Sequence, residues 1–296
     1  MAQTLEQALL HLGGRAGNTE IAFFGGSFTA IDRSYMLSLL EAAKPYLSRF
    51  HGIRISTRPD YIDEEVLALL KAYGVTAIEL GAQSMDNSVL ELNQRGHTAE
   101  DVINAARLIR SHGFSLGLQM MTGLYGAAPE TDIATAEQFI AIHPDTVRVY
   151  PTVIMRGTEL ATLYQNGDFV PYTPEQSVEL CAKLILMFAK ADITIIRLGL
   201  HYSDSLVRNS LGDNYHPAFK ELCEGKIFDD RFLAAAKAVG SRRLVVTVHP
   251  KSLSKLLGQR KCNLKNWQKM GYEVAVQFDE SLNKYELGVW DATEIS

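Results

Sequence analysis

Val-Thr-Ala-Ile-Glu-Leu-Gly-Ala-Gln occupies residues 75–83, an apolar run in which Glu79, Gly81 and Gln83 stand at alternate positions and so share one face. Such a run fits a buried strand with one polar face. A helical segment precedes it, which Asp63 can cap at its start and Gly74 can close. The stretch therefore predicts a helix followed by a strand of a parallel sheet.

The same order of strand and helix repeats from residue 20 to residue 200. The candidate strands are residues 20–25, 53–57, 75–83, 115–121, 146–150 and 193–200. Two further helices have clear starts, at Thr98-x-x-Asp101 and at Thr173-Pro174. Strands that alternate with single helices form parallel sheets, and six of them fit either a barrel or an open sheet. Polar residues near several strand ends favour the mouth of a (β/α) barrel.

The chain beyond residue 205 has a different pattern. Residues 216–228 look rich in loops and lead into a helix near residues 230–239, after which strand and helix signals return. We expect a domain boundary near residue 240, with a partial (β/α) barrel in residues 1–240 and a small α/β module in residues 241–296. Residues 241–272 carry eight Lys and Arg and no Asp or Glu, whereas the whole chain has a net charge of −5. A basic surface on an acidic protein predicts a polyanionic partner.

Cysteine spacing and hydropathy argue against a disulfide-rich protein, a cysteine metal motif and a membrane protein. The cysteines Cys181, Cys223 and Cys262 lie too far apart in sequence for a disulfide framework or a metal motif. No uncharged apolar run approaches the roughly 18 residues that a membrane span needs. The first twelve residues read as an amphipathic helix rather than a signal peptide. We therefore expect a cytoplasmic protein without membrane contact.

Several short motifs occur in an order that resembles the radical S-adenosylmethionine (SAM) superfamily. They are FFGGSFT (23–29), STRPD (56–60), ELGAQSM (79–85), RGHT (95–98), LQMMTGL (118–124) and VRVYP (147–151). The sequence looks most similar to bacterial relatives of the elongator catalytic subunit and, more distantly, to oxygen-independent coproporphyrinogen oxidase. The similarity covers roughly residues 1–230 and implies a partial TIM-like radical SAM barrel.

The resemblance also implies which residues bind SAM. Glycine permits a close approach of the backbone to the SAM ammonium, and an arginine suits its carboxylate. Gln83, Ser84 and Gln119 match positions that hold the SAM carboxylate or the ribose hydroxyls. Ser56 stands where many relatives have a glutamate. The predicted SAM-binding residues are Gly25, Gly26, Ser27, Ser56, Gln83, Ser84, Arg95 and Gln119.

This sequence does not contain the cysteine motif that binds the iron–sulfur cluster of the family. Relatives hold a [4Fe–4S] cluster through a Cys-x3-Cys-x2-Cys loop after the first barrel strand, and thiolates are needed for it. Met1 falls after that loop, so the resemblance predicts a barrel without its first strand, without a cluster and without activity in a chain that begins there. Truncation or a late start is the favoured explanation, and loss of the chemistry is the other.

The C-terminal piece resembles a KH-type RNA-binding module. The segment SKLLGQRK (254–261) is similar to the helix–GxxG–helix segment that clamps a phosphate backbone, although Lys261 replaces the second glycine. The predicted RNA-binding residues are Lys255, Gly258, Arg260, Lys261 and Lys265. The partner implied is RNA, above all tRNA, bound through residues 241–272.

Three functions remain open at this stage. The first is a radical SAM enzyme that, supplied by an electron donor, generates a 5′-deoxyadenosyl radical and acts on RNA or tRNA. The second is a barrel protein that binds RNA without chemistry. The third is an oxidoreductase similar to oxygen-independent coproporphyrinogen oxidase.

Overall fold

The computed structural model describes residues 1–293, which form two compact units. The first unit contains residues 1–152 and 188–197, and the second contains residues 153–187 and the chain from residue 198 onward. No helix within residues 1–293 combines the length and the apolar composition needed to cross a bilayer.

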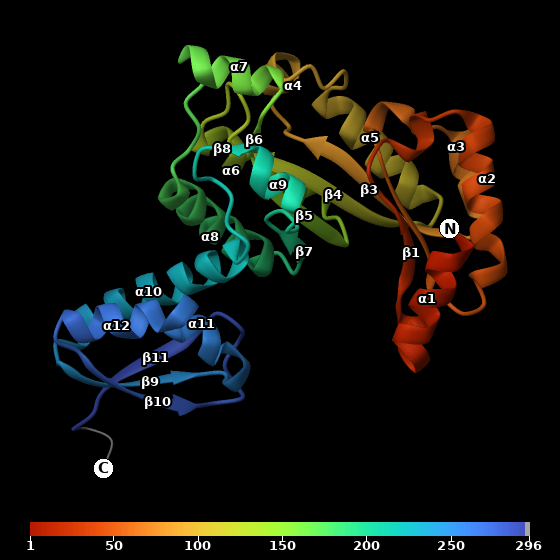
Figure 1. Cartoon of the computed structure of the whole chain (residues 1–296). Helices are drawn as coiled ribbons and strands as arrows, with labels where there is room; N and C mark the ends of the chain where they lie inside the picture. The colour runs from red at the N-terminus through yellow and green to blue at the C-terminus, as the bar shows by residue number, and fades with distance from the viewer. Residues whose placement is uncertain (294–296) are drawn as a thin grey trace. The chain divides into compact units, whose positions relative to one another are not determined.

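A six-stranded sheet in the order β1-β2-β3-β4-β5-β7 forms the centre of the first unit and curves into half a barrel (Figure 1). The pairings from β1 to β5 are all parallel. The strands are β1 (Glu20–Phe23), β2 (Gly52–Thr57), β3 (Val75–Gln83), β4 (Ser115–Thr122), β5 (Thr146–Pro151) and β7 (Thr194–Leu198). The sheet agrees with the predicted α/β fold, and the ends of each strand differ from the expected ones by at most two residues.

Helices connect the strands and cover one face of this sheet. They are α1 (Ala2–Leu12), α2 (Arg33–Ala43), α3 (Glu64–Ala72), α4 (Asn87–Leu92), α5 (Ala99–Ser111) and α6 (Pro129–Ile142). Helices α3, α5 and α6 contact β3 and β4, where Ile78, Leu80 and Leu118 are fully buried. Because side chains alternate along a strand, Glu79 and Gln119 point to the opposite face. The polar face of the half-barrel is therefore the one that the helices leave uncovered.

Local capping fixes where two of these helices begin. The carboxylate of Asp63 accepts a hydrogen bond from the Val66 backbone N–H at 2.7 Å, which starts α3. Thr98 and Asp101 form a reciprocal capping box at the start of α5. Both starts were predicted from the sequence and are confirmed, because a cap depends only on residues within one helical turn.

The second unit ends in a three-stranded sheet in the order β10-β9-β11, in which β10 is parallel and β11 antiparallel to β9. A two-stranded pair of β6 and β8 lies earlier in this unit. The strands are β6 (Ile154–Met155), β8 (Ser210–Leu211), β9 (Arg243–Val248), β10 (Glu273–Phe278) and β11 (Leu287–Asp291). The helices are α7 (Glu159–Asn166), α8 (Pro174–Lys190), α9 (Asp204–Asn209), α10 (Phe219–Val239), α11 (Leu253–Leu257) and α12 (Cys262–Lys269).

Helix α10 corrects one expectation. The sequence predicts loops over residues 216–228, yet α10 begins at Phe219 and runs without interruption through Gly225. Glycine inside a helix costs about 1 kcal/mol relative to alanine. Here the helix packs against α11, and a Cβ at Gly225 would lie at van der Waals distance, 3.4 Å, from the Gly258 Cα. Tertiary packing against α11 therefore outweighs the local propensity.

The predicted domain boundary near residue 240, between residues 1–240 and 241–296, stays a prediction. Helix α10, which ends before residue 240, packs against β11 and α11 within the second unit.

Candidate functional site

A cavity of about 370 Å³ lies at the carboxyl ends of the strands of the first unit. It is lined by Phe24, Gly25, Gly26, Ser27, Ser56, Thr57, Arg58, Gly81, Gln83, Arg95, Gln119 and Tyr150. Seven of the eight predicted SAM-binding residues are in this set, and Ser84 is not. Two other hollows, of about 530 and 420 Å³, are lined mainly by residues of the outer helix α5 and its neighbours. Parallel α/β sheets bind their ligands at the carboxyl ends of their strands. This position makes the cavity of about 370 Å³ the candidate site.

The turn after β1 brings backbone rather than side chains to the cavity. Gly25 has a φ of +109°, which L side chains rarely adopt, and so this position requires glycine. A Cβ built at Gly25 or Gly26 would meet no atom within 4 Å and would project into open space. The turn therefore leaves room for a ligand to approach its carbonyl groups.

Arg95 supplies an uncompensated cation to the same cavity. Its Nε is buried and has no hydrogen-bond partner within residues 1–293. Burial, together with the neighbouring charge of Arg58, lowers the pKa of Arg95 from its ordinary value. Arg58 itself is satisfied, since its Nε and Nη2 donate to the Asp60 carboxylate at 2.9 and 2.6 Å. A buried guanidinium N–H without an acceptor is costly, and a carboxylate of a ligand at the cavity would satisfy it.

Gln83 reaches the cavity through an irregular end of β3. Its φ of +65° lies in the left-handed region, and the register between β3 and β4 shifts between Leu80 and Gln83. A Cβ at Gly81 would lie 2.8 Å from the Gln83 Nε2, so Gly81 leaves space for this side chain. Strained backbone held by its surroundings is typical of binding sites.

Ser84 and His97 serve the scaffold instead. The Ser84 hydroxyl accepts a hydrogen bond from the Asp86 N–H at 3.1 Å and lies 3.4 Å from the Thr135 hydroxyl, within the protein interior. The buried His97 contacts the Ala82 carbonyl through Nε2 at 3.0 Å. Neither side chain lines the cavity.

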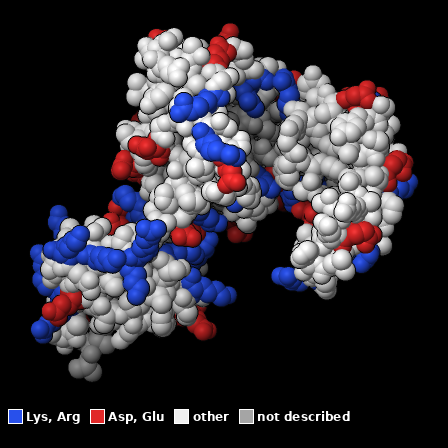
Figure 2. All heavy atoms as spheres, viewed as in Figure 1, with Lys and Arg blue, Asp and Glu red and all other residues white. Residues whose placement is uncertain are grey.

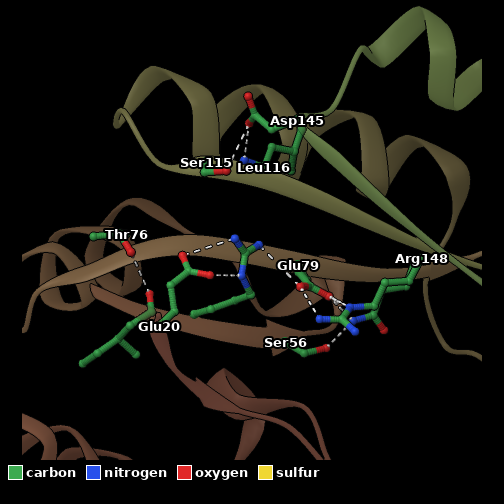
Figure 3. A network of polar contacts seen from close by, with 11 residues as sticks. Glu20, Ser56, Thr76, Glu79, Ser115, Leu116, Asp145 and Arg148 are labelled. Carbon is green, nitrogen blue, oxygen red and sulfur yellow. Dashed lines mark hydrogen bonds and ion pairs between the residues drawn. The ribbon is translucent and has the colours of Figure 1, made fainter. Parts of the chain in front are cut away.

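A network of charged side chains crosses the polar face of the sheet (Figure 3). Arg54 on β2 bonds Glu20 on β1 at 2.6 and 3.2 Å and contacts Glu79 on β3 at 3.4 Å. Arg148 on β5 forms two hydrogen bonds to Glu79, at 2.6 and 3.0 Å. Burial works to lower the pKa of Arg148, but the hydrogen bonds and charge of Glu79, with Tyr150, raise it above its ordinary value. The network ties four strands together behind the cavity.

Sequence reasoning missed several residues that line the cavity. Phe24, Thr57, Arg58 and Tyr150 are absent from the predicted set, although each lies within one residue of the carboxyl end of a strand. The Arg148 guanidinium lies 4.8 Å from the centre of the exposed Phe24 ring. Position at a carboxyl strand end was the signal that could have identified all four.

The residues predicted to contact RNA lie around the turn between α11 and α12. Gly258 is buried with a φ of +72°, and a Cβ there would lie 2.7 Å from Cys262 Sγ. Asn263 anchors the turn by donating to the carbonyls of Gly225 and Leu256 at 2.8 and 3.1 Å. Lysine and arginine gather over this part of the second unit (Figure 2).

The predicted cations at this turn differ in exposure. Arg260, Lys261 and Lys265 are exposed. Lys255 is half-buried, with Nζ 4.0 Å from the Glu224 carboxylate, and burial lowers its pKa. The three exposed cations are free to meet phosphates, whereas Lys255 faces a carboxylate of its own unit.

The cysteines do not match the cluster that the resemblance implies. Cys181 and Cys223 are buried and Cys262 is exposed. Residues 1–293 contain no group of three or more His, Cys, Asp or Glu side chains placed to hold a metal ion. This donor set does not fit an iron–sulfur cluster.

Two family models match the sequence, the Radical SAM superfamily over residues 2–139 and the Radical_SAM C-terminal domain over residues 144–228. The chain is 31% identical over 207 residues to a tRNA uridine(34) acetyltransferase of Methanocaldococcus jannaschii. It is 32% identical over 203 residues to Elongator complex protein 3 of Homo sapiens. These matches cover 62% and 61% of this chain but 37% of each relative, so the chain spans little more than a third of the length of these proteins.

The fold has a counterpart among solved structures. Elp3 of the archaeon Methanocaldococcus infernus, with an N-terminal deletion, aligns with a TM-score of 0.65 at 24% identity and covers 78% of this chain and 58% of that chain. The likeness confirms the predicted fold, a partial radical SAM barrel followed by a small C-terminal α/β unit. Family models, relatives and fold agree, and the chain belongs to the radical SAM superfamily.

Proposed function

We propose that the protein functions with the radical SAM enzymes of tRNA modification, with the first unit binding SAM and the second unit contacting RNA. The radical step itself needs cluster ligands that residues 1–293 do not supply. The buried, unpartnered Nε of Arg95 at the cavity carries the SAM half of the proposal. The names of the relatives, a tRNA acetyltransferase and an elongator protein, support the tRNA half.

The lining of the cavity suits the separate groups of SAM. Arg95 would pair with the carboxylate, and the carbonyls of the Gly25-Gly26 turn would accept hydrogen bonds from the ammonium. Gln83 and Gln119 offer polar groups to the ribose hydroxyls. When bound, SAM supplies the carbon–sulfur bond whose cleavage begins the chemistry of this superfamily.

The exposed cations around Gly258 support RNA contact by the second unit. Arg260 and Lys261 both have left-handed backbone conformations, and they belong to a turn that Asn263 holds in place. Side chains on such a fixed turn would bind phosphates through charge and would release counterions. The predicted similarity of this unit to a KH-type RNA-binding module is part of the same proposal.

Replacement of Arg95 tests SAM binding. Arg95→Gln should weaken the affinity for SAM by about 10- to 100-fold, because a charge-assisted hydrogen bond contributes about 1.5–3 kcal/mol. Isothermal titration calorimetry with SAM and with decarboxylated SAM would measure this. The wild-type chain should prefer SAM, and Arg95→Gln should bind the two ligands equally.

Arg58→Gln is the matched control, since this guanidinium lines the same cavity but already pairs with Asp60. It should retain the preference for SAM over the decarboxylated ligand. A wild-type chain that binds both ligands equally would contradict the assignment of Arg95.

The two alternatives predict other outcomes. A barrel that binds RNA without chemistry would bind tRNA but not SAM. An oxidoreductase of the coproporphyrinogen type would bind a tetrapyrrole and would be indifferent to tRNA. Titration of the same preparation with SAM, bulk tRNA and coproporphyrinogen separates the three.

A further inference from the structure

Glu79 lies directly behind the cavity without lining it. Its side chain, 1% exposed, accepts hydrogen bonds at Oε2 from Gln119 Nε2 at 2.8 Å and from Arg148 Nε at 2.6 Å. At Oε1 it accepts from Arg148 Nη2 at 3.0 Å and contacts Arg54 Nη1 at 3.4 Å. Two guanidinium groups thus offset the charge of a carboxylate that is removed from water.

This carboxylate decides which end of the Gln119 amide faces it. An ionised carboxylate only accepts hydrogen bonds, whereas a glutamine amide has a donor end and an acceptor end. The reverse orientation would place the Gln119 carbonyl oxygen against Glu79 and would leave a buried charge without its donor. The second N–H of the Gln119 amide has an acceptor too, the Ser56 hydroxyl at 3.1 Å.

The acceptor end of Gln119 is therefore left for a ligand. Gln119 lines the cavity, and both hydrogen bonds of its side chain use Nε2. Within residues 1–293 its Oε1 has no hydrogen-bond donor, and so this wall of the cavity presents a carbonyl oxygen with a fixed direction. A carbonyl oxygen receives hydroxyl or amine groups and repels a carboxylate.

We propose that Glu79 is a positioning residue, which holds Gln119 so that the cavity recognises hydroxyl groups of its ligand at this wall. The proposal rests on the proposed function, in which the ligand is SAM. It divides the cavity into an anion-binding part at Arg95 and a hydroxyl-binding part at Gln119. The sequence left open whether Gln119 meets the carboxylate or the ribose, and the orientation of the amide selects the ribose.

Affinities for two ligands test this role. Calorimetry on the full chain would compare SAM with 2′,3′-dideoxy-SAM, which lacks both ribose hydroxyls. The wild-type chain should bind SAM about tenfold more tightly, since a hydrogen bond of this kind contributes about 1 kcal/mol or more. In Glu79→Ala the amide of Gln119 is free to rotate, so the ratio of the two affinities should fall toward one.

Glu20→Ala is the matched control. Glu20 belongs to the same network through Arg54, at 2.6 and 3.2 Å, but does not contact Gln119. It should leave the ratio of affinities unchanged, whereas a purely structural role of the network would make both variants behave alike. If Glu79→Ala does not fold, Glu79→Asp keeps the charge between the two arginines but withdraws it from Gln119, and the same fall in the ratio is expected.

The outcomes separate this inference from the proposed function. A wild-type chain that does not bind SAM overturns both. A wild-type chain that binds SAM tightly, with an unchanged ratio in the folded Glu79 variant, overturns the positioning role alone.

Discussion

Gly258 joins α11 to α12 with φ +72° and ψ 169°, a backbone conformation that glycine adopts and other residues avoid. A Cβ there would also lie 2.7 Å from Cys262 Sγ and 2.8 Å from Asn263 Oδ1. Asn263 in turn holds the carbonyls of Gly225 and Leu256. One glycine therefore fixes both the shape of the turn and its attachment to α10.

Gly258→Ala should lower the free energy of unfolding by about 3 kcal/mol or more, because it combines backbone strain with a steric clash. Gly240→Ala is the control: its φ of +76° is also left-handed, but a Cβ there would meet no atom within 4 Å. That variant should cost about 1 kcal/mol. Urea unfolding measures both, and equal losses would show that the packing around Gly258 contributes nothing.

At the scale of elements, the start of α5 makes the stability of the protein depend on pH. Hydrogen bonds from the backbone and the hydroxyl of Thr98 lower the pKa of Asp101 below its ordinary value. The group is thus more acidic in the folded chain than in the unfolded chain. Its stabilisation is fully present above the unfolded pKa, near 4, and is lost as the pH falls through the lower folded pKa.

Asp101→Asn should therefore lower the free energy of unfolding by about 1 kcal/mol at pH 7, the usual size of a capping interaction. The difference from the wild-type chain should shrink as the pH falls from the unfolded pKa, near 4, through the lower folded pKa of Asp101. Glu100→Gln removes a charge from the same helical turn without touching the capping box. Urea titrations of the three proteins at pH 7 and at pH 3 would check this, and a constant difference for Asp101→Asn would refute it.

At the scale of the whole molecule, binding of tRNA should depend on the charge of the second unit rather than on total charge. Replacement of Arg260, Lys261 and Lys265 by alanine should weaken tRNA binding and reduce the slope of log affinity against log salt by about 2 to 3, since each phosphate contact contributes about 0.7–0.9. Filter binding over a salt series with bulk tRNA measures the slope.

The control removes the same number of exposed cations from the first unit, at Arg15, Arg49 and Arg107. It should leave the slope unchanged. Equal effects of the two triple variants would mean that tRNA contacts the protein through general charge alone. Lys255→Ala should change the slope little, because this lysine already faces Glu224.

The sequence by itself determined the six strands of the main sheet, the starts of α3 and α5, and the polar face of that sheet. The alternation of side chains along β3, the caps at Asp63 and Thr98 and the glycine turn at Gly25 are local, and each depends on a few neighbouring residues. Seven of the eight predicted cavity residues follow from such local patterns and from the family resemblance.

The tertiary structure alone decided which polar side chains face the cavity and which hold others in place. Ser84 and Gln83 are adjacent, yet one bonds Asp86 and the other reaches the cavity, because β3 changes register at its end. Glu79 meets Gln119 and Arg148 across 40 and 69 residues of sequence. Pairing between distant strands sets these contacts, and no local period encodes them.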